Sequence, residues 1–343
     1  MGDRGCVGLG AFLMANGRVT ACDLEDNGIG REGGEALFSA AREAGGLAQL
    51  NLAGNSLQGA MGALARALVC PAGPLLRVSL ERCKLGDKGC AALAEGLGAG
   101  SSLLELKLGT NAISDVGFAK ICGALEANDT LRVLDLPWNS IRDADPLCRC
   151  LKANSTIRSV CLTWNKVGSS GAAALARALR EAPGGKGGGN ATLEHLDLSY
   201  NEVTSEACPE LARAVQQSPS LAHLGLSGNP LGEEGALKVL SGAHQGSKLQ
   251  RVEMRACGLA RSGPIPVDAV SDPSAIAAGN VFILRQVCPS LLGTLPMPAR
   301  RPPQGRRAPA LGELRASREE GWNSQTKLDV TPRPQPLAPP PPK

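Results

Sequence analysis

Two aspartates are the residues of this chain whose spacing most suggests chemistry. Asp135 and Asp197 hold the same place in two runs of alternating leucines, "LRVLDLPWNSI" and "LEHLDLSYNEV". If these runs are strands of one parallel sheet with one strand between them, the carboxylates lie about 10 Å apart, which would suit a general acid and a general base. No nucleophile or pocket accompanies them, and an open, wetted face does not raise a carboxyl pKa. We therefore predict ion-pairing groups and no catalysis.

Histidine and cysteine offer a second chemistry, metal binding. His195 and His223 also hold equivalent places in two such runs, and Glu194 or Asp197 would add a third zinc ligand. Cys148 and Cys150 have C-x-C spacing, but no second Cys or His pair stands near them in the sequence. We predict surface histidines, no metal and no cofactor.

The twelve cysteines occupy places that suit a small apolar side chain, which favours reduced thiols in a cytoplasmic or nuclear protein. The opening "MGDRGC" lacks the Ser or Thr of a myristoylation signal, because Cys6 stands in its place. Three N-x-[ST] sequons, at Asn128, Asn154 and Asn190, each precede a leucine run by the same few residues. A structural repeat explains this regularity without glycosylation.

The elements that must position these residues belong to a repeat. Its unit has apolar residues at positions one, four, six and eleven, and Asn or Cys at position nine. Nine copies fit, mostly 28 residues apart, starting at Val19, Leu47, Leu75, Leu103, Leu131, Ile157, Leu193, Leu221 and Leu249. This is the leucine-rich-repeat pattern, in which each unit holds one short strand.

The second half of each unit predicts a helix. Stretches such as "LGDKGCAALAEGL" have apolar residues at the spacing of an amphipathic helix. A strand and a returning helix cannot bury their apolar faces alone, so stacked units form a parallel inner sheet with helices outside. The predicted fold is an α/β leucine-rich-repeat solenoid, with the position-nine side chains bonded to turn backbone.

On these motifs, residues 3 to 260 resemble the ribonuclease-inhibitor type of leucine-rich repeat, which also forms the repeat arrays of NOD-like receptors and Ran GTPase-activating proteins. The resemblance implies a horseshoe and leaves the bound partner open. One alternative is a GTPase-activating regulator, although those proteins carry an acidic tail and this tail is basic. A second is an inhibitor resembling ribonuclease inhibitor, which would need a more acidic concave face.

Aromatic residues make up only 2% of the chain, and three of them share position eight on consecutive strands. Trp138, Trp164 and Tyr200 should form a stripe about 10 Å long beside the sheet. One interpretation is that they shield the strand ends. We favour a binding stripe, because exposed Trp and Tyr are enriched at interaction hot spots.

The concave face should be mixed in charge. Positions two, three, five, seven and eight hold nine acidic and seven basic residues, including Lys107 and Arg158. Such a face suits a folded protein partner better than a polyanion, and no nucleic acid is expected. No run of 18 apolar residues occurs, so no membrane span is expected. We predict a monomeric, non-enzymatic scaffold that binds a protein partner on this face, next to Trp138, Trp164, Tyr200, Asp135, Asp197 and His195.

The ends of the array are irregular. The repeat array is assigned to residues 1–260 and starts inside a unit, because "MGDRGC" matches "LGDKGC" at 85–90, at the start of a helix. Residues 261–293 predict a capping segment with a helix begun by Asp272 and Pro273. Residues 294–343 hold half of the 24 prolines and predict a disordered tail.

Within that tail, "RPQPLAP" has Arg333, Pro336 and Pro339 at the spacing of peptides that bind Src-homology-3 domains. We treat this match as a hypothesis for a second protein partner.

Overall fold

A computed structural model of the chain describes residues 1–69, 75–98, 100–180, 189–243 and 247–258. The predicted capping segment, the Pro-rich tail with its Arg333, Pro336 and Pro339, and most of the glycine-rich insertion lie outside these residues.

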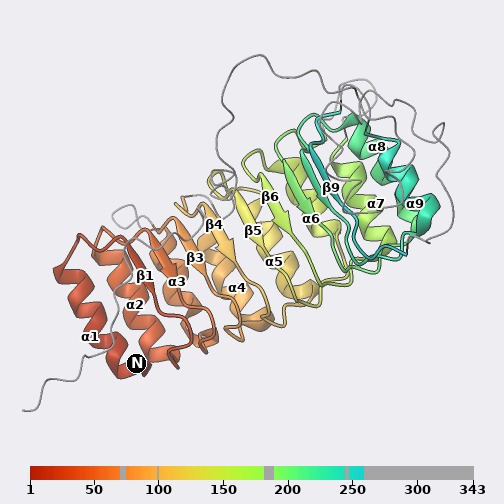
Figure 1. Cartoon of the computed structure of the whole chain (residues 1–343). Coiled ribbons are helices and arrows are strands. Elements are labelled where there is room, and N and C mark those ends of the chain that lie inside the picture. The colour runs from red at the N-terminus through yellow and green to blue at the C-terminus, as the bar shows by residue number, and fades with distance from the viewer. Residues whose placement is uncertain (70–74, 99, 181–188, 244–246, 259–343) are drawn as a thin grey trace, which may run out of the picture.

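The described units run in single file, and each contributes one strand (Figure 1). The strands form one parallel sheet in sequence order, with residues at the same repeat position paired across neighbours. They are β1 (Ala21–Asp23), β2 (Gln49–Asn51), β3 (Arg77–Ser79), β4 (Glu105–Lys107), β5 (Val133–Asp135), β6 (Ser159–Cys161), β7 (His195–Asp197), β8 (His223–Gly225) and β9 (Arg251–Glu253). The predicted unit starts are therefore confirmed.

After each of the strands β1 to β8 a helix returns the chain to the next strand, as the sequence predicts. The helices are α1 (Gly2–Ala15), α2 (Arg31–Glu43), α3 (Met61–Leu68), α4 (Gly86–Leu97), α5 (Asp115–Leu125), α6 (Asp145–Ala153), α7 (Gly168–Ala178), α8 (Cys208–Gln217) and α9 (Gly232–Leu240), with short 3-10 turns η1 (Gln58–Ala60) and η2 (Ser205–Ala207). Helix α1 starts at the point where the sequence matches the start of α4. Among the described residues no helix is long and apolar enough to cross a membrane.

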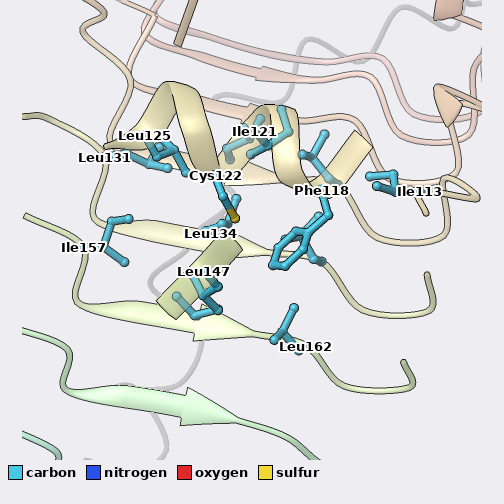
Figure 2. Packing of buried hydrophobic residues seen from close by; sticks show 14 of the residues in the cluster. Ile113, Phe118, Ile121, Cys122, Leu125, Leu131, Leu134, Leu147, Ile157 and Leu162 are labelled. Carbon is cyan, nitrogen blue, oxygen red and sulfur yellow. The ribbon is translucent and has the colours of Figure 1, made fainter. Parts of the chain in front are cut away.

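The core lies between the sheet and the helices and is mainly aliphatic. Figure 2 shows Phe118, Ile121 and Cys122 of α5 directed toward Leu134 of β5, with Leu162 of the next unit alongside. These side chains are fully buried. Because α5 follows β4 in the chain, this helix packs against the strand of the following unit, and the core joins neighbouring units.

The position-nine asparagines form a ladder that holds each unit to the one before it. Asn139 donates its amide hydrogens to the carbonyl oxygens of Leu108, Leu136 and Pro137, and its amide oxygen accepts from the N–H groups of Asn111 and Ile113. Both ends of a buried amide are thereby satisfied. Where cysteine replaces asparagine, the thiol donates to the position-six carbonyl of the preceding unit, as Cys257 does to Leu226.

A second asparagine ladder explains the three sequons. Asn128, Asn154 and Asn190 are buried at the ends of helices. Asn154 donates to the carbonyl oxygens of Leu125 and Asn128, and its amide oxygen accepts from Thr156 and Ile157. Because the side-chain nitrogen is enclosed and bonded, the prediction that the repeat accounts for these motifs is confirmed.

The cysteines named in the repeat are mostly core residues. All ten that the structure describes are unbridged, and nine are buried. Burial raises the pKa of the Cys22, Cys83 and Cys148 thiols to about 11 and that of Cys90 and Cys150 to about 12. Such thiols are poor nucleophiles and poor metal ligands at neutral pH.

Candidate functional site

The three aromatic residues at position eight meet as predicted, and we call their side chains the ring column. The ring centroids of Trp138 and Trp164 lie 4.3 Å apart at an interplanar angle of 11°, and those of Trp164 and Tyr200 lie 4.0 Å apart at 5°. Both distances are shorter than the spacing of about 4.8 Å between strands, so the rings touch face to face. The column is one continuous apolar ridge.

The ridge is open to solvent. The exposed fractions are 55% for Trp138, 40% for Trp164 and 36% for Tyr200, which places them among the few exposed large apolar residues of the described chain. Among the described residues, neither indole N–H nor the tyrosine hydroxyl has a hydrogen-bond partner. The column therefore presents ring edges together with unused donors.

A left-handed backbone conformation sets the direction of the side chains in the ring column. In all nine described units the position-eight residue has positive φ, which is 56° at Trp138, 57° at Trp164 and 56° at Tyr200. This left-handed conformation costs a residue with a side chain about 1–2 kcal/mol relative to glycine. At the three rings the following residue is an asparagine that donates to a carbonyl of the preceding unit and so holds the turn in place. Nothing in the spacing of the leucines reveals this conformation.

Glycine ends the column. The next position-eight residue is Gly228, with φ of 70°. A Cβ atom on Gly228 would lie 2.2 Å from the Tyr200 ring. The absent side chain leaves the space into which Tyr200 leans, so Gly228 helps to position the last ring.

A hollow of about 510 Å³ runs along the column, lined by residues at positions eight, nine and ten of successive units. Besides the rings it includes Lys166, Glu202 and Pro230, all exposed. Neither Lys166 nor Glu202 has an ion-pair partner among the described residues. Sequence reasoning missed both, although their place two residues after the aromatic position is the signal that would have found them.

The charged residues predicted for this face are largely paired with each other. Arg158 bonds Glu194 at 2.5 Å, and Lys107 lies 3.4 Å from Glu105. The Glu105 carboxylate also forms an ion pair with Arg77 of the neighbouring strand, at 3.3 Å. Lys107 and Arg158 are thus already committed to internal ion pairs.

The two aspartates correct the prediction made from the sequence. They lie on β5 and β7 with Cys161 between them, as expected. Neither joins an ion pair within the described residues, however, and burial raises the pKa of Asp135, with further increases from the Glu81 and Glu105 carboxylates. The expected ion-pairing role is therefore wrong for both aspartates among the described residues, and the expected unraised pKa is wrong for Asp135, because its side chain is partly enclosed between strands.

Cys161 and Asp197 complete this part of the sheet. Burial raises the pKa of the Cys161 thiol to about 12, and its sulfur lies 3.1 Å from the Thr163 hydroxyl. The Asp197 carboxylate accepts from the Ser199 N–H at 2.9 Å. In the part of the chain that the structure describes, no activated nucleophile lies beside the two aspartates.

The histidines are neighbours, as predicted. His195 and His223 pair across β7 and β8, with their Nδ1 atoms 3.3 Å apart. Burial lowers the pKa of His223, Arg251 and His195 lower it further, and Glu253 at 3.5 Å opposes this shift. Among the described residues no three His, Cys, Asp or Glu side chains converge closely enough to hold a metal ion.

Comparison with known proteins supports the repeat assignment. The Leucine Rich repeat family matches residues 20–38, 74–94, 153–176 and 189–212. NACHT, LRR and PYD domains-containing protein 12 of Mus musculus is 30% identical over 154 residues, covering 36% of this chain and 15% of that protein. The Homo sapiens protein of the same name is 29% identical over 197 residues, covering 40% of this chain and 19% of its own length.

This chain therefore spans less than a fifth of these relatives. Among solved structures, leiomodin-1 actin-binding site 2 is 16% identical with a TM-score of 0.30, over 47% of this chain and 77% of that one.

Proposed function

Because the chain is a leucine-rich-repeat protein with repeats of the NOD-like receptor type, we propose that it is a non-enzymatic scaffold that binds a protein partner on its concave face. The ring column at the rim of that face is the proposed anchor. Leucine-rich repeats generally mediate protein–protein interaction, and this shared role supports the broad assignment.

The observation that carries the proposal is the continuous exposed ridge of Trp138, Trp164 and Tyr200. Exposed tryptophan and tyrosine combine a large apolar area with few rotatable bonds, so burying them against a partner costs little side-chain entropy. Each ring that becomes fully buried is worth on the order of 2 kcal/mol of binding energy.

The internal ion pairs support a shape-based interface. Since Arg158 and Lys107 already have carboxylate partners, a partner gains little from them unless it replaces those contacts. Lys166 and Glu202 are different, because they border the hollow and have no ion-pair partners within the described ranges. We propose that these two residues fix the orientation of the partner and the rings supply most of the affinity.

The experiment is a quantitative pull-down with the full chain and a double variant, Trp138→Asn with Trp164→Asn. Asparagine tolerates positive φ better than other residues with side chains, so the turn is preserved while the rings are lost. The control changes Arg82→Asn and Thr110→Asn, two position-eight residues outside the column with φ of 56° and 55°. Proteins that bind the control and the unchanged chain equally, and the double variant at least tenfold less, support the proposal. Equal recovery with all three chains would refute it.

A further inference from the structure

We infer that the ring column binds a proline-rich segment in the polyproline II conformation, and that its occupant in this protein is residues 332–342 of the same chain. This inference rests on the proposed function only in using the same surface. The segment reads "PRPQPLAPPPP" and includes Arg333, Pro336 and Pro339. Aromatic-lined surfaces recognise such segments because the extended conformation is already favoured before binding.

The hydrogen-bond donors of the ring column favour a ligand with free carbonyl oxygens. The indole N–H groups of Trp138 and Trp164 and the Tyr200 hydroxyl lack partners among the described residues. A polyproline II segment has no internal hydrogen bonds, so its carbonyl oxygens are free to accept. A helix would offer few backbone acceptors, because most of its carbonyls are bonded internally.

Addition of a strand is excluded at this surface. The backbone N–H groups of Trp138, Trp164 and Tyr200 already donate to the carbonyls of Thr163, Ser199 and Ser227 in the next unit. The column lies between paired strands and not at an edge of the sheet. The ligand must therefore be bound through side chains, as polyproline II segments are.

The dimensions match one turn of the ligand. The two ring spacings of 4.3 and 4.0 Å give the column a length of about 8 Å. One polyproline II turn covers three residues and about 9 Å. Pro336 and Pro339 are one turn apart, so they can contact the two ends of the column together.

Charge and reach favour the chain's own segment. Arg333 lies one further polyproline II turn from Pro336, and the carboxylate of Glu202, which has no partner among the described side chains, borders the same hollow. Residues 259–331 join the last described strand region to the segment. Gly258 belongs to the second unit after that of Tyr200, and two strand spacings amount to about 10 Å. The extended length of residues 259–331 is many times this distance. An intramolecular ligand also has a high effective concentration.

If residues 332–342 occupy the column, they compete with the protein partner. The tail then sets how much of the scaffold is open, and any protein that removes the proline segment, such as a Src-homology-3 domain bound to Arg333, Pro336 and Pro339, frees the rings. The Src-homology-3 hypothesis and the ring column thereby become parts of one mechanism.

The test uses the full chain with Trp322→Phe, which leaves Trp138 and Trp164 as its only tryptophans. In a second chain, called tail-Gly, Pro334, Pro336 and the four prolines 339–342 are all changed to glycine. We expect the acrylamide quenching constant of tryptophan emission to be roughly twofold higher in tail-Gly, because docking covers the exposed part of each indole. A free peptide of residues 331–343, added to tail-Gly, should bring quenching back to the lower value.

A labelled form of the same peptide is then titrated into tail-Gly by fluorescence anisotropy. Adding Tyr200→Asn to tail-Gly should weaken binding at least tenfold, whereas adding Thr110→Asn should leave it unchanged. Equal quenching in both chains, no peptide binding at millimolar concentration, or binding that is insensitive to Tyr200→Asn would each overturn the inference. Recovery of the protein partner by tail-Gly is measured separately. If this recovery depends on Trp138 and Trp164 while the peptide does not bind, the proposed function is supported and docking of the tail is refuted.

Discussion

Replacing Trp164 by alanine should destabilise the protein more than replacing either neighbour in the column. Trp164 stacks on two rings, whereas Trp138 and Tyr200 each stack on one. A stacked aromatic pair is worth about 0.5–1.5 kcal/mol beyond its burial. Trp164→Ala should therefore cost about 1–3 kcal/mol, and each outer ring about half of that. The fully buried Leu162 sets the scale, since Leu162→Ala should cost about 2–5 kcal/mol.

The backbone can be separated from the ring by a second substitution at the same site. Glycine adopts the positive φ of 57° without strain, so Trp164→Gly should gain about 1–2 kcal/mol of folding free energy relative to Trp164→Ala. The greater freedom of glycine in the unfolded chain reduces this gain by about 0.5–1 kcal/mol. Urea unfolding followed by circular dichroism measures all these free energies. The reasoning fails if Trp164→Ala costs no more than Trp138→Ala, or if Trp164→Gly is less stable than Trp164→Ala.

Three further outcomes follow. Asn139→Ala should cost about 2–5 kcal/mol by urea unfolding, because two buried N–H groups lose their acceptor, and Asn139→Cys should cost less if the thiol bonds a carbonyl as Cys257 does. Burial raises the pKa of Asp135 above the ordinary aspartate value near 3.8. The protonated carboxyl therefore stabilises the fold at pH values below 3.8, and this contribution is lost as the pH rises through the raised pKa. Asp135→Asn should thus raise the melting temperature at pH 7 by an amount that shrinks toward acid pH, and a constant difference would contradict this. Ellman's reagent should find all twelve thiols in denaturant and react with few in the native protein; a slow or incomplete reaction in denaturant would indicate disulfides.

Much of the fold follows from the sequence because each unit repeats the same local rules. Leucines at positions one, four and six can be buried together only by a short strand, and the Ala- and Leu-rich stretch that follows has helical spacing. The parallel order then makes equal positions neighbours. The contacts between Trp138, Trp164 and Tyr200 and between His195 and His223 are direct consequences of that register.

The features that the sequence does not reveal depend on contacts between units. Asp135 and Asp197 occupy the same repeat position, yet burial and two nearby carboxylates raise the pKa of Asp135. The neighbours that cause this shift belong to other strands, so no local pattern predicts it. Likewise, Arg158 has an ion-pair partner in the next unit, whereas Lys166 and Glu202 have none among the described residues, and this difference is a property of the assembled units.

Stability does not account for the ring column. Each of the three rings occupies a left-handed backbone position that glycine fills in two other units, at Gly54 and Gly228. A residue with a side chain costs about 1–2 kcal/mol more than glycine in this conformation. This cost is partly offset because glycine loses about 0.5–1 kcal/mol more conformational entropy on folding. Over three residues the net cost is about 1.5–3 kcal/mol, and two stacked pairs return about 1–3 kcal/mol. The rings therefore leave the folding free energy nearly unchanged while exposing apolar area and unused donors, and a ligand that covers both supplies the favourable free energy that the fold alone does not.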